Sequence, residues 1–245
     1  LPSSYASLLR WRPALCVNLH GGARSRLLTL ASLAPVKAGF AHQRGAWIYG
    51  EKIPRAQEIL GVERVVHTAE HLASAMFHLG APRAEVPRAQ LYADPAPLEG
   101  RPYAVIHPAA ALPYKQWRSE GFLDVAGYLD RERGLEPVFI GAASDDMSPF
   151  RRHRVVAGAP LGRIKSLLAG ASLFIGNDSG PAHMACALGR PVVVLYGRQE
   201  HLQIWAPWRP VAARTIYSPA GVKAIAAREV IRAAVLAGRG IGYSP

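Results

Sequence analysis

The fold is decided by the stretch Phe174-Ile175-Gly176-Asn177-Asp178-Ser179-Gly180-Pro181-Ala182-His183. A short apolar run over residues 172–175 is typical of a buried parallel strand. Turn-forming residues follow, and Pro181 stands where the first turn of a helix is expected. Gly189 ends that predicted helix, and residues 192–195 form a second apolar run. The stretch therefore predicts a strand, a tight turn, a short helix and a second strand.

The turn before this predicted helix has two chemical readings. Free backbone N–H groups at a helix N-terminus favour an anion, most commonly phosphate, and Asp178, Ser179 and His183 lie beside them. The same residues also describe an ordinary turn with a capped helix. Residue chemistry alone leaves both readings open.

The order of residues in this stretch carries a resemblance to a known family. The string Asn-Asp-Ser-Gly-Pro-x-His, followed by a valine-rich strand that ends in Leu-Tyr-Gly, resembles the signature of glycosyltransferase family nine. These proteins are the bacterial ADP-heptose:lipopolysaccharide heptosyltransferases and their relatives. One departure is Cys186, where the family usually has alanine, and it implies only a small change in packing.

Composition limits the class of protein. The 245 residues are half apolar, which allows a substantial core, yet no run reaches 18 apolar residues. The two cysteines, Cys16 and Cys186, imply neither a metal site nor a disulfide framework, so a cytoplasmic location is expected, in solution or at the inner-membrane surface. A net charge of +12 suits anionic partners such as nucleotides, sugar phosphates and lipid head groups. No basic run or aromatic-interleaved stripe indicates nucleic acid, which is not expected as a partner.

Strand patterns alternate with helix patterns along the chain, which predicts a parallel α/β fold. Strands are expected over 14–19, 36–40, 103–107, 137–140 and 154–157, and helices over 24–33, 67–79, 161–169 and 222–236. A Pro- and Ala-rich stretch from Pro82 to Pro102 is typical of a linker, so we place a boundary between domains 1–98 and 99–245. The resemblance implies the GT-B type, with two Rossmann-like domains facing a cleft.

Polar or glycine-rich loops follow three predicted strands of the second domain, after His107, Ile140 and Ile175. In a doubly wound sheet, ligands bind beyond the carboxyl ends of strands, so three such loops together indicate a ligand site. The segment from His107 to Trp117 resembles the family's second signature. By that resemblance Lys115 is the lysine that contacts the donor phosphate, with Trp117 beside it. By itself, a lysine at this position would be read as a surface residue.

The resemblance assigns the remaining donor-site residues. The loop Gly141 to Asp146 is expected to touch the nucleoside, with Asp145 accepting hydrogen bonds from ribose hydroxyls. The adjacent pair Asp145-Asp146 is a weak sign of a metal ion, and the family needs none, so no metal or cofactor is expected. Ser179 and the Gly180 N–H are expected to hold phosphate, and Asp178 to fix the loop or contact the sugar. His183 could neutralise phosphate or bond a carbonyl, and both remain open.

The first predicted domain matches the family more loosely. Asn18 and His20 stand where the family often has Asp and Gln, and His20 could face an acceptor or bond its own loop. The family takes its general base from an N-terminal Gly-Asp turn, and nothing in the chain matches it. The chain also starts at Leu1 rather than Met, so we expect the first domain to be incomplete, with the missing turn encoded upstream.

The implied function is inverting, metal-independent transfer of a heptose or related sugar from an ADP-sugar to a lipopolysaccharide inner-core acceptor. Lys115 and Asp178 are the expected catalytic residues. The missing base predicts that these 245 residues bind a nucleotide diphosphate without transferring sugar. If transfer did occur, Glu51 and Glu70 would be the first bases to test. Alternatives are a non-catalytic nucleotide-sugar or lipid-binding module, and another GT-B enzyme such as a nucleotide-sugar epimerase.

Overall fold

The computed structural model describes residues 13–95 and 98–238, and the chain divides into two compact units, Leu1–Val86 and Pro87–Pro245. This division falls earlier in the chain than the predicted boundary at residue 98. The reason is that residues 87–91 of the Pro-rich stretch bind the second unit. The Leu91 N–H donates to the Ala187 carbonyl, and the Trp208 indole N–H donates to the Pro87 carbonyl.

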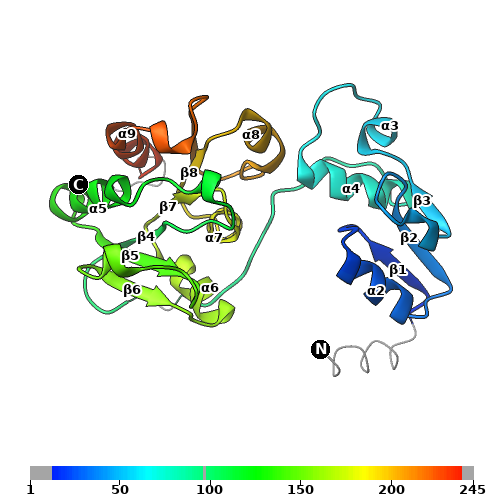
Figure 1. Ribbon diagram of the computed structural model, residues 1–245, viewed down its shortest axis with the longest axis horizontal. Coiled ribbons are helices and arrows are strands. Elements are labelled where there is room, and N and C mark those ends of the chain that lie inside the picture. Colours follow the sequence, from blue (N-terminus) through cyan, green and yellow to red (C-terminus); the bar gives the residue numbers. More distant parts are fainter. Residues whose placement is uncertain (1–12, 96–97, 239–245) are drawn as a thin grey trace. The chain divides into compact units, whose positions relative to one another are not determined.

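The first unit is built on a parallel sheet in the order β1-β2-β3, formed by Leu15–Asn18, Val36–Phe40 and Glu51–Ile53 (Figure 1). Helices α2 (Ala23–Ala31), α3 (Ala56–Leu60) and α4 (Thr68–His78) complete it, with the 3-10 turn η1 (Ala46–Ile48). Its core gathers small and apolar side chains around Phe40, Ile53 and Ala75. The strands and helices predicted over 14–19, 24–33, 36–40 and 67–79 are therefore present, whereas β3 and α3 were not predicted.

The second unit contains a six-stranded parallel sheet in the order β6-β5-β4-β7-β8-β9. The strands are β4 (Tyr103–His107), β5 (Glu136–Gly141), β6 (Arg154–Ala157), β7 (Leu173–Asn177), β8 (Val192–Tyr196) and β9 (Ala213–Tyr217). Strands β4, β5, β7 and β8 are almost completely buried, as expected for a parallel sheet covered on both faces. The order reverses between β4 and β7, which is the topological switch point of a doubly wound sheet.

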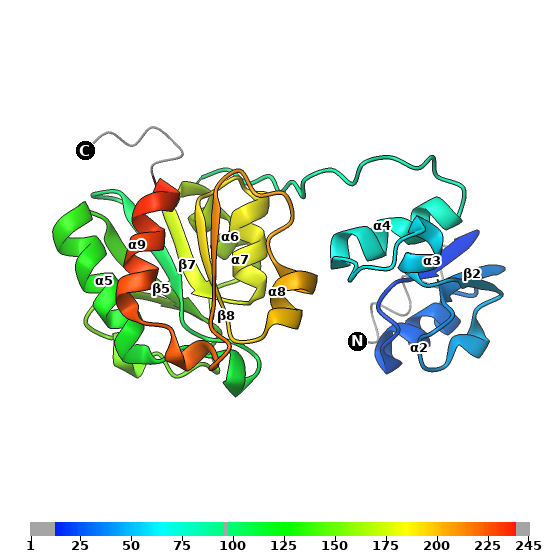
Figure 2. The same cartoon turned by 90° about the horizontal axis from the view of Figure 1, so that it is seen from above.

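Helices cover both faces of this sheet. Figure 2 shows α5 (Ser119–Arg133) and α9 (Ala227–Gly238) on one face, and α6 (Leu161–Gly170) and α7 (Gly180–Ala187) on the other. Phe122, Val125 and Leu129 of α5 pack with Val230 and Ala234 of α9 in one core cluster. The second cluster joins α6 and α7 to the opposite sheet face. The short helix α8 (Gln199–Trp205) follows β8.

The last predicted helix, over 222–236, begins later than expected. Residues Val222–Ala224 form the 3-10 turn η4, and Ile225 leaves helical geometry with ψ of 126°. The Ile225 carbonyl accepts hydrogen bonds from the Trp117 indole and from the Arg118 guanidinium, so it is held outside the helix. These two donors are more than 100 residues away in sequence, so a local pattern could not reveal the interruption.

Candidate functional site

A cavity of about 480 Å³ lies at the carboxyl ends of β4, β5 and β7. His107 ends β4, Gly141 ends β5, and Asp178 follows β7, and all three line the cavity. The loop from Ala109 to Leu112 and the first residues of α7 supply further walls. Because β4 and β7 are the strands that flank the switch point, this is the position at which a doubly wound sheet binds its ligand.

Asn177 fixes the loop that covers this cavity. Its side chain is fully buried, its Oδ1 accepts from the Trp117 N–H at 3.1 Å, and its Nδ2 donates to the Pro108 carbonyl at 2.8 Å. Both ends of the 108–117 loop are thereby attached to the end of β7. The sequence prediction did not include Asn177 among the site residues, because both of its partners are distant in sequence.

Trp117 does not line the cavity. Its side chain is 3% exposed, its indole N–H donates to the Ile225 carbonyl at 2.9 Å, and its ring packs edge-on against Phe122. The sequence prediction placed Trp117 among the nucleotide-binding residues. The structure places it instead in the core, where it anchors the end of the 108–117 loop, so any influence on a ligand passes through that loop.

Lys115 and Asp178 form an ion pair beside the cavity. The distance from Lys115 Nζ to Asp178 Oδ2 is 2.6 Å, and the Asp178 side chain is 7% exposed. His183 Nε2 lies 3.9 Å from Asp178 Oδ1, and His201 Nδ1 lies 3.9 Å from Oδ2. A buried carboxylate is thus surrounded by three nitrogen-bearing side chains, which hold it in place.

His201 was not predicted as a site residue, because the helix that carries it, α8, was not recognised. Burial lowers the pKa of His201, and the nearby Lys115 charge lowers it further. The Tyr114 ring lies 5.8 Å from the His201 ring, and the Arg198 guanidinium lies 4.2 Å above the Tyr114 ring. Helix α8 and the loop that carries Lys115 therefore support each other around Asp178.

A second pair of side chains joins β4 to the start of α7. His107 Nδ1 lies 2.9 Å from Ser179 Oγ, and His107 is 9% exposed. Burial lowers the pKa of His107 to about 4, so its imidazole is neutral at pH 7. Ser179 occupies the N-cap position of α7, yet its side chain makes no capping bond to that helix. His107 was not predicted as a site residue either.

The start of α7 is open toward the cavity. Gly180 lines it, and a Cβ added there would meet nothing within 4 Å. Because the Ser179 hydroxyl faces His107 rather than the helix, no side chain caps the start of α7. Pro181 has no N–H and the Ala182 N–H donates to the Ser179 carbonyl, so in this turn the Gly180 N–H is the donor left at the cavity. Such N–H groups attract an anion.

Asp145 shapes the loop after β5. Its Oδ2 accepts from the Ala142 N–H at 2.7 Å, and both residues line the cavity. The neighbouring Asp146 accepts instead from the Ser148 N–H at 2.9 Å, and hydrogen bonds from Ser148 lower its pKa. The two carboxylates therefore serve different turns. Within residues 13–95 and 98–238, no group of three His, Cys, Asp or Glu side chains is arranged to hold a metal ion.

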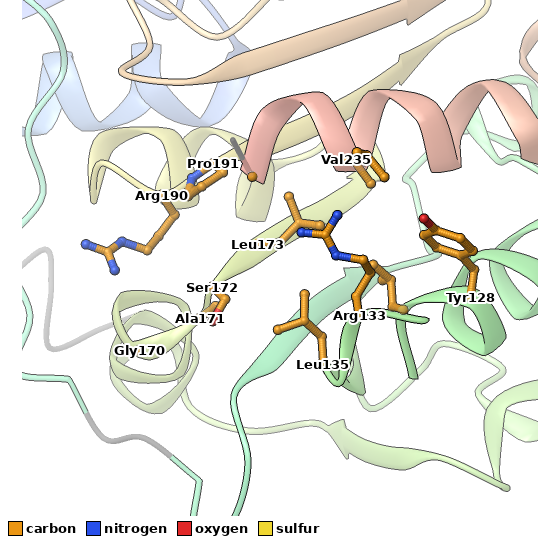
Figure 3. Close-up of a pocket in the computed structure, with 13 residues that line it drawn as sticks. Tyr128, Arg133, Leu135, Gly170, Ala171, Ser172, Leu173, Arg190, Pro191 and Val235 are labelled. Carbon is orange, nitrogen blue, oxygen red and sulfur yellow. The ribbon is translucent and has the colours of Figure 1, made fainter. Parts of the chain in front are cut away.

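A smaller cavity of about 180 Å³ lies at the opposite, amino-terminal edge of the same sheet. Figure 3 shows Leu135, Leu173 and Val235 around it, with Arg133 among them and the Arg190 side chain extending away. Its lining is largely apolar and is drawn from the ends of α5, α6 and α9. None of the predicted site residues lines this smaller cavity.

In the first unit, the carboxyl ends of the strands carry histidines. Asn18 Oδ1 accepts from the N–H groups of His20 and Gly21, and His20 Nδ1 accepts from the Gly22 N–H at 3.2 Å. His20 therefore bonds its own loop, which was one of its two readings. His71 of α4 stacks on Phe40 at the end of β2, with ring centroids 4.1 Å apart.

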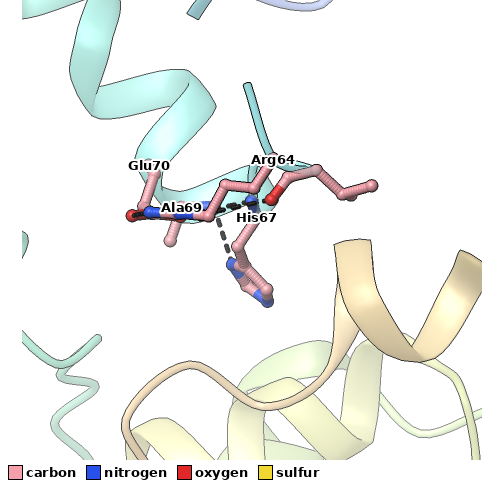
Figure 4. Close-up of polar contacts among 5 residues, drawn as sticks. Arg64, His67, Ala69 and Glu70 are labelled. Atoms are coloured by element: carbon pink, nitrogen blue, oxygen red, sulfur yellow. Dashed lines mark hydrogen bonds and ion pairs between the residues drawn. The ribbon is translucent and has the colours of Figure 1, made fainter. Parts of the chain in front are cut away.

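The two glutamates named as alternative bases are both engaged. Figure 4 shows Glu70 at the start of α4, where its carboxylate meets Arg64 with hydrogen bonds of 2.6 and 2.9 Å. The same carboxylate accepts from the His67 N–H, completing a capping box. The Arg64 hydrogen bonds hold the pKa of Glu70 below its ordinary value. Glu51 Oε1 lies 2.7 Å from His78 Nε2.

Fold and site together define a class: a doubly wound α/β protein with a cavity at its topological switch point. The family model of glycosyltransferase family 9 (heptosyltransferase) matches residues 14–220. The chain belongs to this family.

Sequence and structure comparisons agree with that assignment. The chain is 33% identical over 120 residues to lipopolysaccharide heptosyltransferase 3 of Escherichia coli, a match over 44% of this chain and 35% of that protein. The match thus spans about a third of the length of this curated relative. A family 9 glycosyltransferase from Veillonella parvula superposes with a TM-score of 0.79 at 20% identity, covering 97% of this chain and 78% of that one.

A second solved structure extends the likeness. E. coli ADP-heptose lps heptosyltransferase II gives a TM-score of 0.72 at 22% identity, over 97% of this chain and 80% of that one. At sequence identities of 20% and 22%, these two structures are evidence about the fold alone. They confirm the predicted α/β fold of GT-B type. In the described part of the chain, no helix combines the length and apolarity needed to cross a membrane.

Proposed function

We propose that this protein acts in sugar transfer from an ADP-linked heptose, or a related nucleotide sugar, to the inner core of lipopolysaccharide. The observation that carries the proposal is the switch-point cavity, where Lys115, Ser179 and the uncapped start of α7 line one space. Family membership supports the sugar-transfer chemistry. The name of one structural relative, ADP-heptose lps heptosyltransferase II, supports this choice of donor and acceptor.

Lys115 is the residue that stabilises the departing diphosphate. Its ammonium has three N–H donors, and the bond to Asp178 at 2.6 Å uses one of them. The other donors remain for phosphate oxygens, on which negative charge increases as the bond to the sugar breaks. Asp178 holds the ammonium at the cavity wall, and the Gly180 N–H at the start of α7 binds the same oxygens.

The remaining polar groups orient the donor. Asp145 Oδ2 accepts the Ala142 N–H, which leaves acceptor capacity on this carboxylate for ribose hydroxyls. A carboxylate base takes the proton of the acceptor hydroxyl, whose oxygen attacks the anomeric carbon from the side opposite the diphosphate. The bond from that carbon to the diphosphate breaks as the new bond forms, so the configuration inverts. No step of this scheme uses a metal ion.

The basic surface of the protein suits the anionic partner that this function requires. A net charge of +12 favours association with lipopolysaccharide core phosphates and with the inner-membrane surface on which such acceptors are carried. A cytoplasmic location supplies the nucleotide sugar.

A second candidate function is nucleotide-sugar binding without transfer. The observation in its favour is that Glu70 and Glu51, the named candidates for a base, are already paired with Arg64 and His78. Deprotonation of an acceptor hydroxyl needs a carboxylate within hydrogen-bond reach, about 3 Å, and one that is free to accept the proton.

One experiment separates these proposals. ADP binding is measured by calorimetry, and sugar transfer is measured with an ADP-heptose donor and a lipopolysaccharide core acceptor. For a transferring enzyme, Lys115→Ala should lower turnover on the order of a hundredfold, more than it lowers donor affinity. The matched control is Lys223→Ala, which removes an exposed lysine elsewhere in the same unit.

Three outcomes are informative. Absence of ADP binding would overturn the nucleotide site. Binding without transfer would favour the second candidate. Transfer that is equally fast in the wild type and the Lys115→Ala variant would show that Lys115 does not stabilise the departing diphosphate.

A further inference from the structure

The charges around the switch-point cavity do not by themselves account for binding of a diphosphate. Among the described residues that line it, the ionisable groups of fixed charge at pH 7 are Lys115, Asp145 and Asp178. One positive and two negative side chains leave a formal balance of −1. A diphosphate therefore depends on uncharged donors at this site as well as on Lys115.

His107 and Ser179 together form one such uncharged donor. A neutral imidazole has one N–H and a serine has one O–H, so the pair holds two mobile protons. The contact of 2.9 Å between His107 Nδ1 and Ser179 Oγ uses one of these protons. One proton is therefore left to donate elsewhere, and the tautomer of His107 decides which side chain carries it.

Position favours Ser179 as the side chain that donates outward. Ser179 is the N-cap of α7, is partly exposed, and precedes the cavity-lining Gly180. His107 lines the same cavity from the end of β4 but is more deeply buried, with 9% of its surface exposed. An anion at the N-terminus of α7 would accept from the Ser179 hydroxyl. His107 must then donate its Nδ1 proton to the Ser179 oxygen.

We propose that His107 is a positioning residue that acts through Ser179. Its Nδ1–H bond to Ser179 Oγ turns the hydroxyl proton toward a phosphate oxygen of a nucleoside diphosphate. The inference rests on the proposed function, because it deepens the description of the same anion site. Burial keeps the imidazole neutral, so the pair contributes a directed donor without adding charge.

The test is a double-mutant cycle on the full chain, with ADP and adenosine as the two probes. His107→Phe and Ser179→Ala should each weaken ADP binding about tenfold, the usual scale for one hydrogen bond to a charged group. Because His107 acts through Ser179, the double variant should bind no more weakly than Ser179→Ala alone. Affinity for adenosine, which has no phosphate, should not change.

A conservative variant and a spectroscopic readout complete the test. His107→Asn keeps an amide near the position of Nδ1 and should recover most of the lost ADP affinity. In ¹⁵N NMR of the ADP complex, His107 should carry its proton on Nδ1.

The outcomes distinguish this inference from the proposed function. A wild-type protein that binds no ADP would overturn the nucleotide site itself. If the wild type binds ADP, additive losses in the cycle would mean that His107 contacts the ligand directly and would overturn the positioning role. An Nε2–H tautomer, unchanged ADP affinity in the single variants, or an equal loss of adenosine binding would also overturn it.

Discussion

The two edges of the six-stranded sheet carry cavities whose polar groups differ. At the carboxyl edge, the cavity is lined by Lys115, Asp178, Ser179 and the start of α7. At the amino edge, the cavity is enclosed by apolar side chains and by the last residues of α5 and α9. Both belong to the same unit and the same strands, so the sheet itself does not account for the difference.

The difference follows from the direction of the backbone. In a parallel sheet with crossover helices, the helices start at one edge and end at the other. N–H groups converge on the carboxyl edge and give it partial positive charge, whereas carbonyl groups converge on the amino edge. Arg133, the last residue of α5, stands at the negative end of its helix dipole. Arg133 is therefore accounted for by the helix end, whereas the start of α7 brings a helix N-terminus to the cavity at the carboxyl edge.

The largest expected contrast between the edges is in their response to pH. His107 has a folded pKa of about 4 against 6.5 in its ordinary state. As pH falls from 6.5 toward 4, the unfolded chain binds this proton first, so the unfolding free energy should fall by up to about 3 kcal/mol. Above pH 6.5 the imidazole is neutral in both states and contributes no such dependence.

Urea denaturation of the wild type and of His107→Asn between pH 4 and 7 measures this contribution, because other titrating groups cancel in the difference. An Arg133→Ala control should retain the wild-type dependence, since arginine does not titrate in this range. If the unfolding free energies of the wild type and of His107→Asn changed equally with pH between 4 and 7, the prediction would be contradicted.

A smaller contrast concerns steric access to the start of α7. In Gly180→Val, the added side chain projects into open space at the cavity, so ADP affinity should fall on the order of tenfold while the melting temperature changes little. Gly162→Val is the matched control, because Gly162 also lies in the first turn of a helix with open space around it and is not among the residues that line this cavity, although its neighbours Leu161 and Ile164 are. Equal ADP affinities by calorimetry would remove α7 from the site.

The smallest effect is expected at the amino edge. Arg133→Glu reverses the charge at the end of α5 and should cost about 0.5 kcal/mol of stability through the helix dipole. ADP affinity should not change. Chemical denaturation and calorimetry on the same variant check both statements, and a loss of ADP binding would mean that the two edges are coupled.

The sequence was most informative where local pattern and structure coincide. Strands β4 and β6 have the predicted bounds, and Lys115, Gly141, Asp145, Asp178, Ser179 and Gly180 line one cavity as three converging loops suggested. Strand β9 and helix α8 were missed. The edge strand β9 pairs with β8 alone and is partly exposed, so its apolar pattern is weak.

The residues missed at the site share a physical cause. Asn177 bonds partners 60 and 69 positions away, and His107 meets Ser179 across 72 positions. A buried amide or imidazole in a strand reads as an ordinary core residue until its distant partner is known. The burial of Trp117 in the core could not be predicted for the same reason, because its indole partner, the Ile225 carbonyl, is 108 positions away.

The two hydrogen bonds of Asn177 also bear on the energetics of ligand capture. They fasten both ends of the 108–117 loop to a buried strand, so the loop that carries Lys115 is continuous with the core rather than a lid. A binding loop that is ordered in advance loses little conformational entropy when its ligand arrives. The conformational entropy of the 108–117 loop is lost when the unit folds. Nucleotide binding therefore does not have to offset that loss.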